Sequence, residues 1–338
     1  MAKENVANVE NIDDFILDFL DKRKDRLPIT GLHVNGLFPT TYSEKKVLLA
    51  GGFYDHVCIR DTYIYNTESQ SFVKGPDLPS SRKDTALCYL EGKNAVLSSG
   101  GHNMHFQAIG YEATNACYIY SSEFENFKEC GKMLYPRSGH RAVHLRGDNV
   151  FMHGGCNGKD APYGLFEIFN TTYGSSRAVD ALHCTRRYLH GAAMLNDGRI
   201  FLCGGRYARR GSHNMASNLT DLYDPCSGTF TLGPYMPSYM EYATATMLTN
   251  GDVLVVGQVG SFLFDYRMMQ FRSGPDLTKR RKRHFTAKLP DEKVMIGGGD
   301  ALHSKTYEIY NERTQKFETT PSPEMPDNLY DYTAACLF

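Results

Sequence analysis

Short apolar runs recur along the chain, and glycine ends almost every one of them. They are VLLAGG ending at Gly52, AVLSSGG at Gly101, VFMHGG at Gly155, IFLCGG at Gly205 and KVMIGGG at Gly299, with a degenerate copy, VLVVGQ, ending at Gln258. Short apolar runs bounded by turn residues are typical of buried strands. Most intervals between these marks are about 50 residues, the length of a unit of four strands. The pattern therefore predicts an all-β repeat protein.

A second landmark follows each glycine mark. It is an aromatic residue with a turn-forming residue directly after it: Tyr65-Asn66, Tyr120-Ser121, Phe169-Asn170, Tyr223-Asp224, Phe264-Asp265 and Tyr310-Asn311. Seven residues after each aromatic stands Phe in five copies and Ser176 in the third. Asn, Asp and Ser initiate turns, so we expect the two positions on adjacent strands of a β-hairpin, packed against the neighbouring repeat. One spacing kept in six copies predicts six repeats.

Another apolar strand stands about ten residues before each glycine mark except the first. The segment DYTAACLF, residues 331–338, has the pattern of the strand missing from the first repeat. We expect it to pair with the N-terminal strands, because this closes a ring of sheets and removes exposed strand edges.

These landmarks resemble the kelch repeat, in which a diglycine ends the second strand and is followed by Tyr and then by a large aromatic. The family usually has Trp at the later position, whereas this chain has no Trp and uses Phe. The resemblance covers residues 45–338 and implies a six-bladed β-propeller with four-stranded antiparallel blades, closed by the C-terminal strand. The expected blades are 45–75 with 331–338, then 84–130, 138–178, 188–231, 240–273 and 284–318.

The first 44 residues lie outside the predicted ring. Residues 1–27 include Phe15, Ile16 and Phe19 at helical spacing, which predicts a short amphipathic helix. This helix either packs on the propeller or docks into a partner or a second copy of the protein. Residues 28–44 are expected to be a linker.

Composition narrows the class of protein. Hydrophobic residues are 41% and charged residues 22% of 338, and the net charge is −1, which favours a globular protein and disfavours nucleic acid as the partner. No apolar stretch approaches the length that crosses a membrane. The nine cysteines are an odd number without a C-x-x-C pair, which favours a reducing compartment, the cytoplasm or the nucleus.

The candidate binding residues lie in the loops after the glycine marks and in the connections into the next strand. Arginine stands at one register, eight residues before the closing Leu of that strand, in four repeats: Arg82, Arg137, Arg187 and Arg281. The loops add Arg206, Arg209, Arg210, Tyr54 and His102. Guanidinium groups bind carboxylates and phosphates. The alternative for the four repeated arginines is a structural role, in which they bridge blades through backbone carbonyls. The resemblance favours binding, because kelch adaptors recognise acidic peptides through arginines on this face.

We therefore expect a protein-interaction module or scaffold that binds an acidic segment of a protein partner through a basic loop face, with no cofactor and no metal. One alternative is a structural subunit of a larger assembly, favoured by the lack of a BTB-like or F-box-like segment in the sequence. The other is a kelch-fold enzyme acting on a small molecule or sugar. The chain has no P-loop, G-x-S-x-G or H-E-x-x-H motif, and we assign no catalytic residue.

Overall fold

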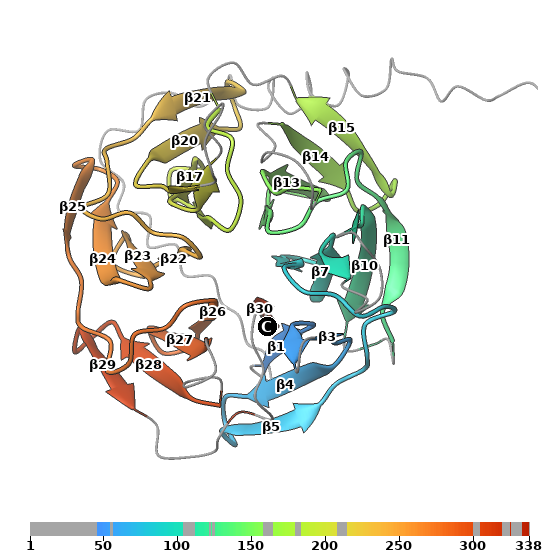
Figure 1. The fold of residues 1–338 in the computed structure, drawn as a ribbon, viewed down its shortest axis with the longest axis horizontal. Helices are drawn as coiled ribbons and strands as arrows, with labels where there is room; N and C mark the ends of the chain where they lie inside the picture. The colour runs from blue at the N-terminus through green and yellow to red at the C-terminus, as the bar shows by residue number, and fades with distance from the viewer. Residues whose placement is uncertain are drawn as a thin grey trace, which may run out of the picture. The chain divides into compact units, whose positions relative to one another are not determined.

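Six four-stranded antiparallel sheets, the blades, follow one another along the chain and stand around a common centre (Figure 1). The computed structural model describes residues 46–54, 57–103, 112–121, 123, 126–157, 165–179, 184–207, 215–299, 305–319, 325 and 333–337. These residues belong to one unit, Tyr42–Phe338. Every regular element within them is a strand, so this part of the chain contains no helix that could span a membrane. The predicted N-terminal helix, with Phe15, Ile16 and Phe19, and the predicted linker lie outside the described residues.

Each blade has an inner, a second, a third and an outer strand. In blade order, the inner strands are β30 (Thr333–Leu337), β6 (Ala86–Leu90), β12 (Arg141–His144), β16 (Gly191–Met194), β22 (Thr244–Met247) and β26 (His284–Leu289). The second strands are β1 (Lys46–Ala50), β7 (Ala95–Ser99), β13 (Asn149–His153), β17 (Ile200–Cys203), β23 (Asp252–Gly257) and β27 (Lys293–Gly298). The third strands are β4 (Thr62–Asn66), β10 (Ala116–Ser121), β14 (Phe166–Asn170), β20 (Thr220–Asp224), β24 (Gly260–Asp265) and β28 (Tyr307–Asn311). The outer strands are β5 (Ser71–Lys74), β11 (Lys128–Lys132), β15 (Ser175–Val179), β21 (Thr229–Leu232), β25 (Gln270–Ser273) and β29 (Lys316–Thr319).

The ring is closed by its last strand. Each inner strand contacts the inner strands of both neighbouring blades, and β30 contacts β6 on one side and β26 on the other. β30 pairs with β1 from Lys46↔Leu337 to Ala50↔Thr333, which covers the edge of β1. This is the position that the sequence assigned to residues 331–338. The predicted six-bladed propeller with four-stranded antiparallel blades is confirmed.

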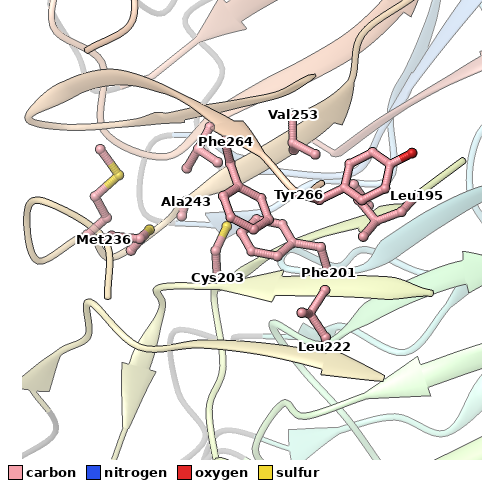
Figure 2. Close-up of a cluster of buried hydrophobic side chains, with 12 residues drawn as sticks. Leu195, Phe201, Cys203, Leu222, Met236, Ala243, Val253, Phe264 and Tyr266 are labelled. Atoms are coloured by element: carbon pink, nitrogen blue, oxygen red, sulfur yellow. The ribbon is translucent and has the colours of Figure 1, made fainter. Parts of the chain in front are cut away.

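Apolar side chains fill the junctions between neighbouring blades. The described residues form six buried clusters, and each draws on two adjacent blades. Figure 2 shows the cluster between blades 4 and 5, in which Phe201 and Phe264 stack with ring centroids 4.5 Å apart. The predicted hairpin pairs are present as well: Tyr65 lies opposite Phe72, with ring centroids 4.8 Å apart. The repeating aromatics therefore supply much of the apolar area that holds the blades together.

The paired glycines allow one blade to approach the next. The amide of Gly101 donates to the carbonyl of Arg137 at 2.8 Å, and the amide of Gly155 donates to that of Arg187 at 3.0 Å. Gly100 has φ of 59°, and a Cβ there would lie only 2.3 Å from the Arg137 carbonyl oxygen. A side chain is excluded at this position, so the glycine mark recurs because blade-to-blade bonding requires it.

Blade 5 replaces the loop after the glycine mark by a tight turn. Gln258 and Val259 alone connect β23 to β24, and Gly257 pairs directly with Gly260. The corresponding connections in blades 1, 2 and 4 are longer and contain two-stranded ribbons: β2 (Phe53–Tyr54) with β3 (Val57–Cys58), β8 (His102–Asn103) with β9 (Glu112–Ala113), and β18 (Arg206–Tyr207) with β19 (Met215–Ala216). The short turn accounts for the short last interval between glycine marks in the sequence.

Candidate functional site

The four arginines at one register lie inside the protein. Arg82 is 2% exposed, and Arg137, Arg187 and Arg281 are 0%, 0% and 1% exposed. We call their position the latch position, because the backbone carbonyls of Arg82, Arg137 and Arg187 accept a hydrogen bond from the second glycine of the preceding blade's mark. Blade 5 has Met240 at the latch position, and its carbonyl accepts from the amide of Gly205 at 2.7 Å.

The latch arginine of blade 3 shows what the side chain does. Nη1 of Arg137 donates to the carbonyls of Gly154 and Leu165, at 2.5 and 3.0 Å. Its Nε donates to Oε1 of Glu167 at 2.7 Å, and this carboxylate is as buried as the guanidinium. The arginine thus ties together the second strand, the third strand and the connection between them.

The same arrangement recurs in two other blades. Arg187 donates to the carbonyls of Gly204 and Leu219 and forms an ion pair with Asp221. Arg281 donates to the carbonyls of Gly298 and Thr306 and pairs with Glu308 at 3.1 Å. In blade 2, Arg82 donates to the carbonyl of Gly100 at 3.1 Å and lies over the ring of Tyr118, 5.0 Å from its centroid.

The acidic partners were not identified from the sequence, although a signal was present. Glu167, Asp221 and Glu308 each stand two residues before the repeating aromatic. Because the third strand alternates its side chains between two faces, that offset places the acid and the aromatic on the same face of the sheet.

The arginines thus have a structural role, but the side-chain bonds of Arg137 lie within one blade, and its link to the preceding blade is made by its backbone carbonyl. Contact between the four latch arginines and a partner stays a prediction, and it would require their present hydrogen bonds to be displaced. Positive charge at the surface comes from other residues.

The remaining predicted binding residues are placed differently. Arg206 lies on β18 with about a third of its side chain exposed, and its Nη1 is 3.5 Å from a carboxylate oxygen of Glu241. His102, on β8, is 8% exposed and lies 2.6 Å from the Ser138 hydroxyl through Nδ1. The side chain of Tyr54, and Arg209 and Arg210 altogether, lie outside the described residues.

Two residues directly after each latch position form what we call the central rim. They are Lys83 and Asp84, Ser138 and Gly139, Tyr188 and Leu189, Glu241 and Tyr242, and Lys282 and Arg283. The second residue of every pair has positive φ, between 53° and 67°. In blades 2 to 4 these second residues are joined by backbone bonds, from Gly139 to Asp84 at 2.9 Å and from Leu189 to Gly139 at 2.7 Å. The rim therefore lies at the end of the propeller where the inner strands begin, and its backbone is hydrogen-bonded from blade to blade through blades 2 to 4.

Cationic side chains outnumber carboxylates at the rim and beside it, within the part of the chain that the structure describes. The cations are Lys83, Arg141, Arg206, Lys282 and Arg283, and the carboxylates are Asp84 and Glu241. Burial raises the pKa of Asp84, while Lys83, Arg283 and Arg141 act in the opposite direction. Cations from blades 2, 3 and 6 thus converge on one carboxyl group.

Glu241 shows how a carboxylate fits between two of these cations. Its oxygens lie 3.5 Å from Arg206 Nη1 and 2.5 Å from Lys282 Nζ. The neighbouring ring of Tyr242 lies beneath Lys282 and Arg283, at 5.6 and 5.2 Å from its centroid. The rim therefore combines positive charge with an aromatic surface, the combination that binds carboxylates beside flat or apolar groups.

Four buried histidines are used inside the blades. Burial lowers the pKa of His140, His153 and His190 well below the usual value and that of His284 to about 3, so all four are neutral. His284, for example, shares a hydrogen bond with the Thr244 hydroxyl of blade 5 at 3.0 Å. The described residues contain no cluster of three His, Cys, Asp or Glu side chains arranged to hold a metal ion.

Comparison with known proteins gives two relatives and no match to a protein-family model. The chain is similar to the tRNA wybutosine-synthesizing protein 4 of Candida glabrata, at 30% identity over 149 residues, which are 40% of this chain and 20% of that protein. It is also similar to the Kelch-like protein terF of Aspergillus terreus, at 24% identity over 211 residues, which are 56% of this chain and 45% of that protein. The matched region spans less than half the length of either relative.

Proposed function

We propose that this chain, which is a kelch-repeat β-propeller, is a protein-interaction module that binds an acidic segment of a partner at the central rim. The observation that carries the proposal is the cluster of Arg206, Glu241 and Lys282, in which one carboxylate already sits between two cations. A partner carboxylate could join or replace Glu241 there with charge-assisted hydrogen bonds. Likeness to a protein named for its kelch repeats supports an interaction role in general.

The test uses a short fluorescent peptide of alternating Glu and Ser, with binding followed by anisotropy. Wild-type protein should bind it, and added salt should weaken binding because the rim charges are partly exposed. Lys282→Glu with Arg283→Glu should weaken binding by about tenfold or more. The peptide failing to bind, or binding equally to this double variant, would refute the proposal.

A matched control carries the same change of charge on the other face. Arg313→Glu with Lys316→Glu alters the hairpin between β28 and β29, where exposed side chains follow the end of β28 that lies away from the rim. Affinity for the peptide should stay within about twofold of wild type, because the length of β28, roughly 16 Å, exceeds the screening length of roughly 8 to 10 Å. Intact folding of both double variants is checked by thermal melting.

RNA is the competing ligand that the comparisons suggest, since one relative is named for the synthesis of wybutosine in tRNA. A tRNA competitor is therefore added to the peptide assay. We expect tRNA to displace the peptide only at concentrations far above the peptide's Kd. If tRNA binds more tightly than the peptide, a nucleic-acid role would replace the proposal.

The assembly-subunit alternative predicts a different behaviour in solution. A subunit that is buried by neighbouring copies should change its apparent mass with concentration on a sizing column. We expect a constant mass for an interaction module, and a rise with concentration would favour the subunit.

A further inference from the structure

The connection from blade 4 to blade 5 carries an exposed apolar strip. Leu232, Tyr235 and Tyr239 are 71%, 70% and 61% exposed. Between the two tyrosines, Met236 is buried at 2% exposure and its amide donates to the carbonyl of Asn218 at 2.8 Å. The buried Met236 and its backbone hydrogen bond thus hold the connection against the propeller, while Tyr235 and Tyr239 face solvent.

The same register carries mostly polar or charged residues in three of the four other connections that lead to a latch position. The register is fixed by equivalent backbone bonds, since Leu78 donates to Arg60 and Met133 donates to Asn115 just as Met236 does to Asn218. Three other connections have, eight, five and one residue before the latch position, Lys74, Asp77 and Ser81; Glu129, Lys132 and Pro136; and Ser273, Asp276 and Arg280. The connection before Arg187 has Val179, Leu182 and Arg186. Only the connection before Met240 has Tyr at both of the last two positions, so the pair of exposed tyrosines is a departure from the repeat and not a property that the fold imposes.

The strip leads from the edge of the propeller to the basic rim. Leu232 lies opposite Asp221, at the end of the blade 4 sheet where the glycine mark stands. At the inner end, only the latch residue Met240 separates Tyr239 from Glu241, the carboxylate that sits between Arg206 and Lys282. The tight turn of blade 5 adds Val259, 42% exposed, at this same end of the sheets.

We infer that this strip is the docking surface for apolar side chains that flank the acidic residues of the partner segment. The inference rests on the proposed function and names the chemistry of the partner: an extended acidic segment with an aromatic or aliphatic residue beside its carboxylates. Charge complementarity selects this occupant, because the strip ends at a cluster rich in cations. A second copy of the chain is disfavoured, since two copies meeting through this face would bring like charges together.

The test compares two fluorescent peptides on the full chain. One is the Glu–Ser peptide, and the other has a single Ser replaced by Phe. Wild-type protein should bind the Phe peptide about fivefold to tenfold more tightly, the range for one aromatic contact. In Tyr235→Ser with Tyr239→Ser that preference should fall to about onefold to twofold, whereas binding of the Glu–Ser peptide should change little.

The controls separate this inference from the proposed function. Tyr173→Ser removes an 80% exposed tyrosine from the hairpin between β14 and β15 and should leave the preference intact. Lys282→Glu with Arg283→Glu should weaken both peptides equally and preserve their ratio. If both peptides bind wild type with equal affinity, the strip is not the docking surface although the rim still binds acids; if neither binds, the proposed function fails first. A strip-dependent dimer in sedimentation, with no preference for Phe, would assign the surface to a second copy instead and overturn the inference.

Discussion

Blade 5 and blade 3 solve the same packing problem with opposite chemistry. In blade 3, Arg137 and Glu167 form a buried ion pair beneath the glycine mark. In blade 5, Met240 takes the place of the arginine and Phe262 the place of the acid, and both pack in the apolar cluster between blades 4 and 5. A buried ion pair can be exchanged for apolar residues of similar volume, but only when both partners change together.

The exchange extends to other positions of blade 5. The residue three places after the latch position is His140, His190 or His284 in the blades with an ion pair, and Ala243 in blade 5. Gln258 replaces the second glycine of the mark. Arginine, acid and histidine are thus present together in blades 3, 4 and 6 and replaced together in blade 5, whereas blade 2 keeps Arg82 and its diglycine with Tyr118 in place of the acid and Thr85 in place of the histidine.

The largest loss of folding stability is expected when one member of a buried ion pair is removed and the other is left. Arg137→Met leaves the Glu167 carboxylate buried without its cation and should destabilise folding by about 3–5 kcal/mol. Urea denaturation measures this. Met240→Leu in blade 5 is the matched control and should cost less than about 1.5 kcal/mol. Equal costs for the two substitutions would contradict the comparison.

Transplanting the blade 5 pair into blade 6 should recover part of such a loss. Arg281→Met alone strands Glu308, whereas Arg281→Met with Glu308→Phe removes both charges. The double variant should be more stable than Arg281→Met by roughly 1–3 kcal/mol, measured as a double-mutant cycle in urea. Strict additivity would show that the two side chains are not coupled.

Acid should act on the blades that contain histidine. Burial lowers the pKa of His284 from 6.5 in the unfolded chain to about 3 in the folded protein. Protonation of the unfolded chain therefore costs the folded protein no stability above pH 6.5, and the free energy of unfolding decreases as pH falls from 6.5 toward 3. At pH 5 the loss is about 2 kcal/mol for this residue. His284→Ala, which copies Ala243 of blade 5, should make the fall in unfolding free energy between pH 7 and pH 5 shallower by about that amount. An unchanged slope would indicate that His284 is already charged in the folded protein.

The smallest expected effect is a change in peptide affinity at the rim. Blade 5 has the carboxylate Glu241 at the rim position where blades 2 and 6 have Lys83 and Lys282. Glu241→Gln should strengthen binding of the Glu–Ser peptide by about twofold to threefold, because a competing negative charge is removed. Weaker binding would mean that Glu241 holds the two cations in place instead of competing for them.

The blade count could be predicted from the sequence because apolar runs, glycine marks and aromatic pairs repeat at fixed spacing. Tyr65 and Phe72 show why: their fixed spacing on one hairpin can be read from the sequence alone, although their contacts with Tyr307 of blade 6 cannot. The orientation of Arg137 could not be obtained in this way. Register places it before an inner strand, but whether it faces solvent or Glu167 depends on contacts made thirty residues later.

The rim was harder still to predict. Lys282 and Arg283 stand in a basic run with Arg281, yet Arg281 is buried and the other two reach the rim. Arg281 and Lys282 are neighbours of the same charge type, and no local sequence pattern marks that only the first is buried. The N-terminal helix and its docking residues remain predictions.

The pairing of β30 with β1 has a consequence for how the molecule assembles. The first blade cannot be completed until the last strand of the ring has been made, so its inner edge waits while five other blades form. Contacts between such distant parts of a chain form slowly, and an uncovered strand edge invites pairing with other chains in the meantime. We therefore expect this propeller to be most prone to misassembly in the interval before β30 pairs with β1. A chaperone would be of most use in that interval.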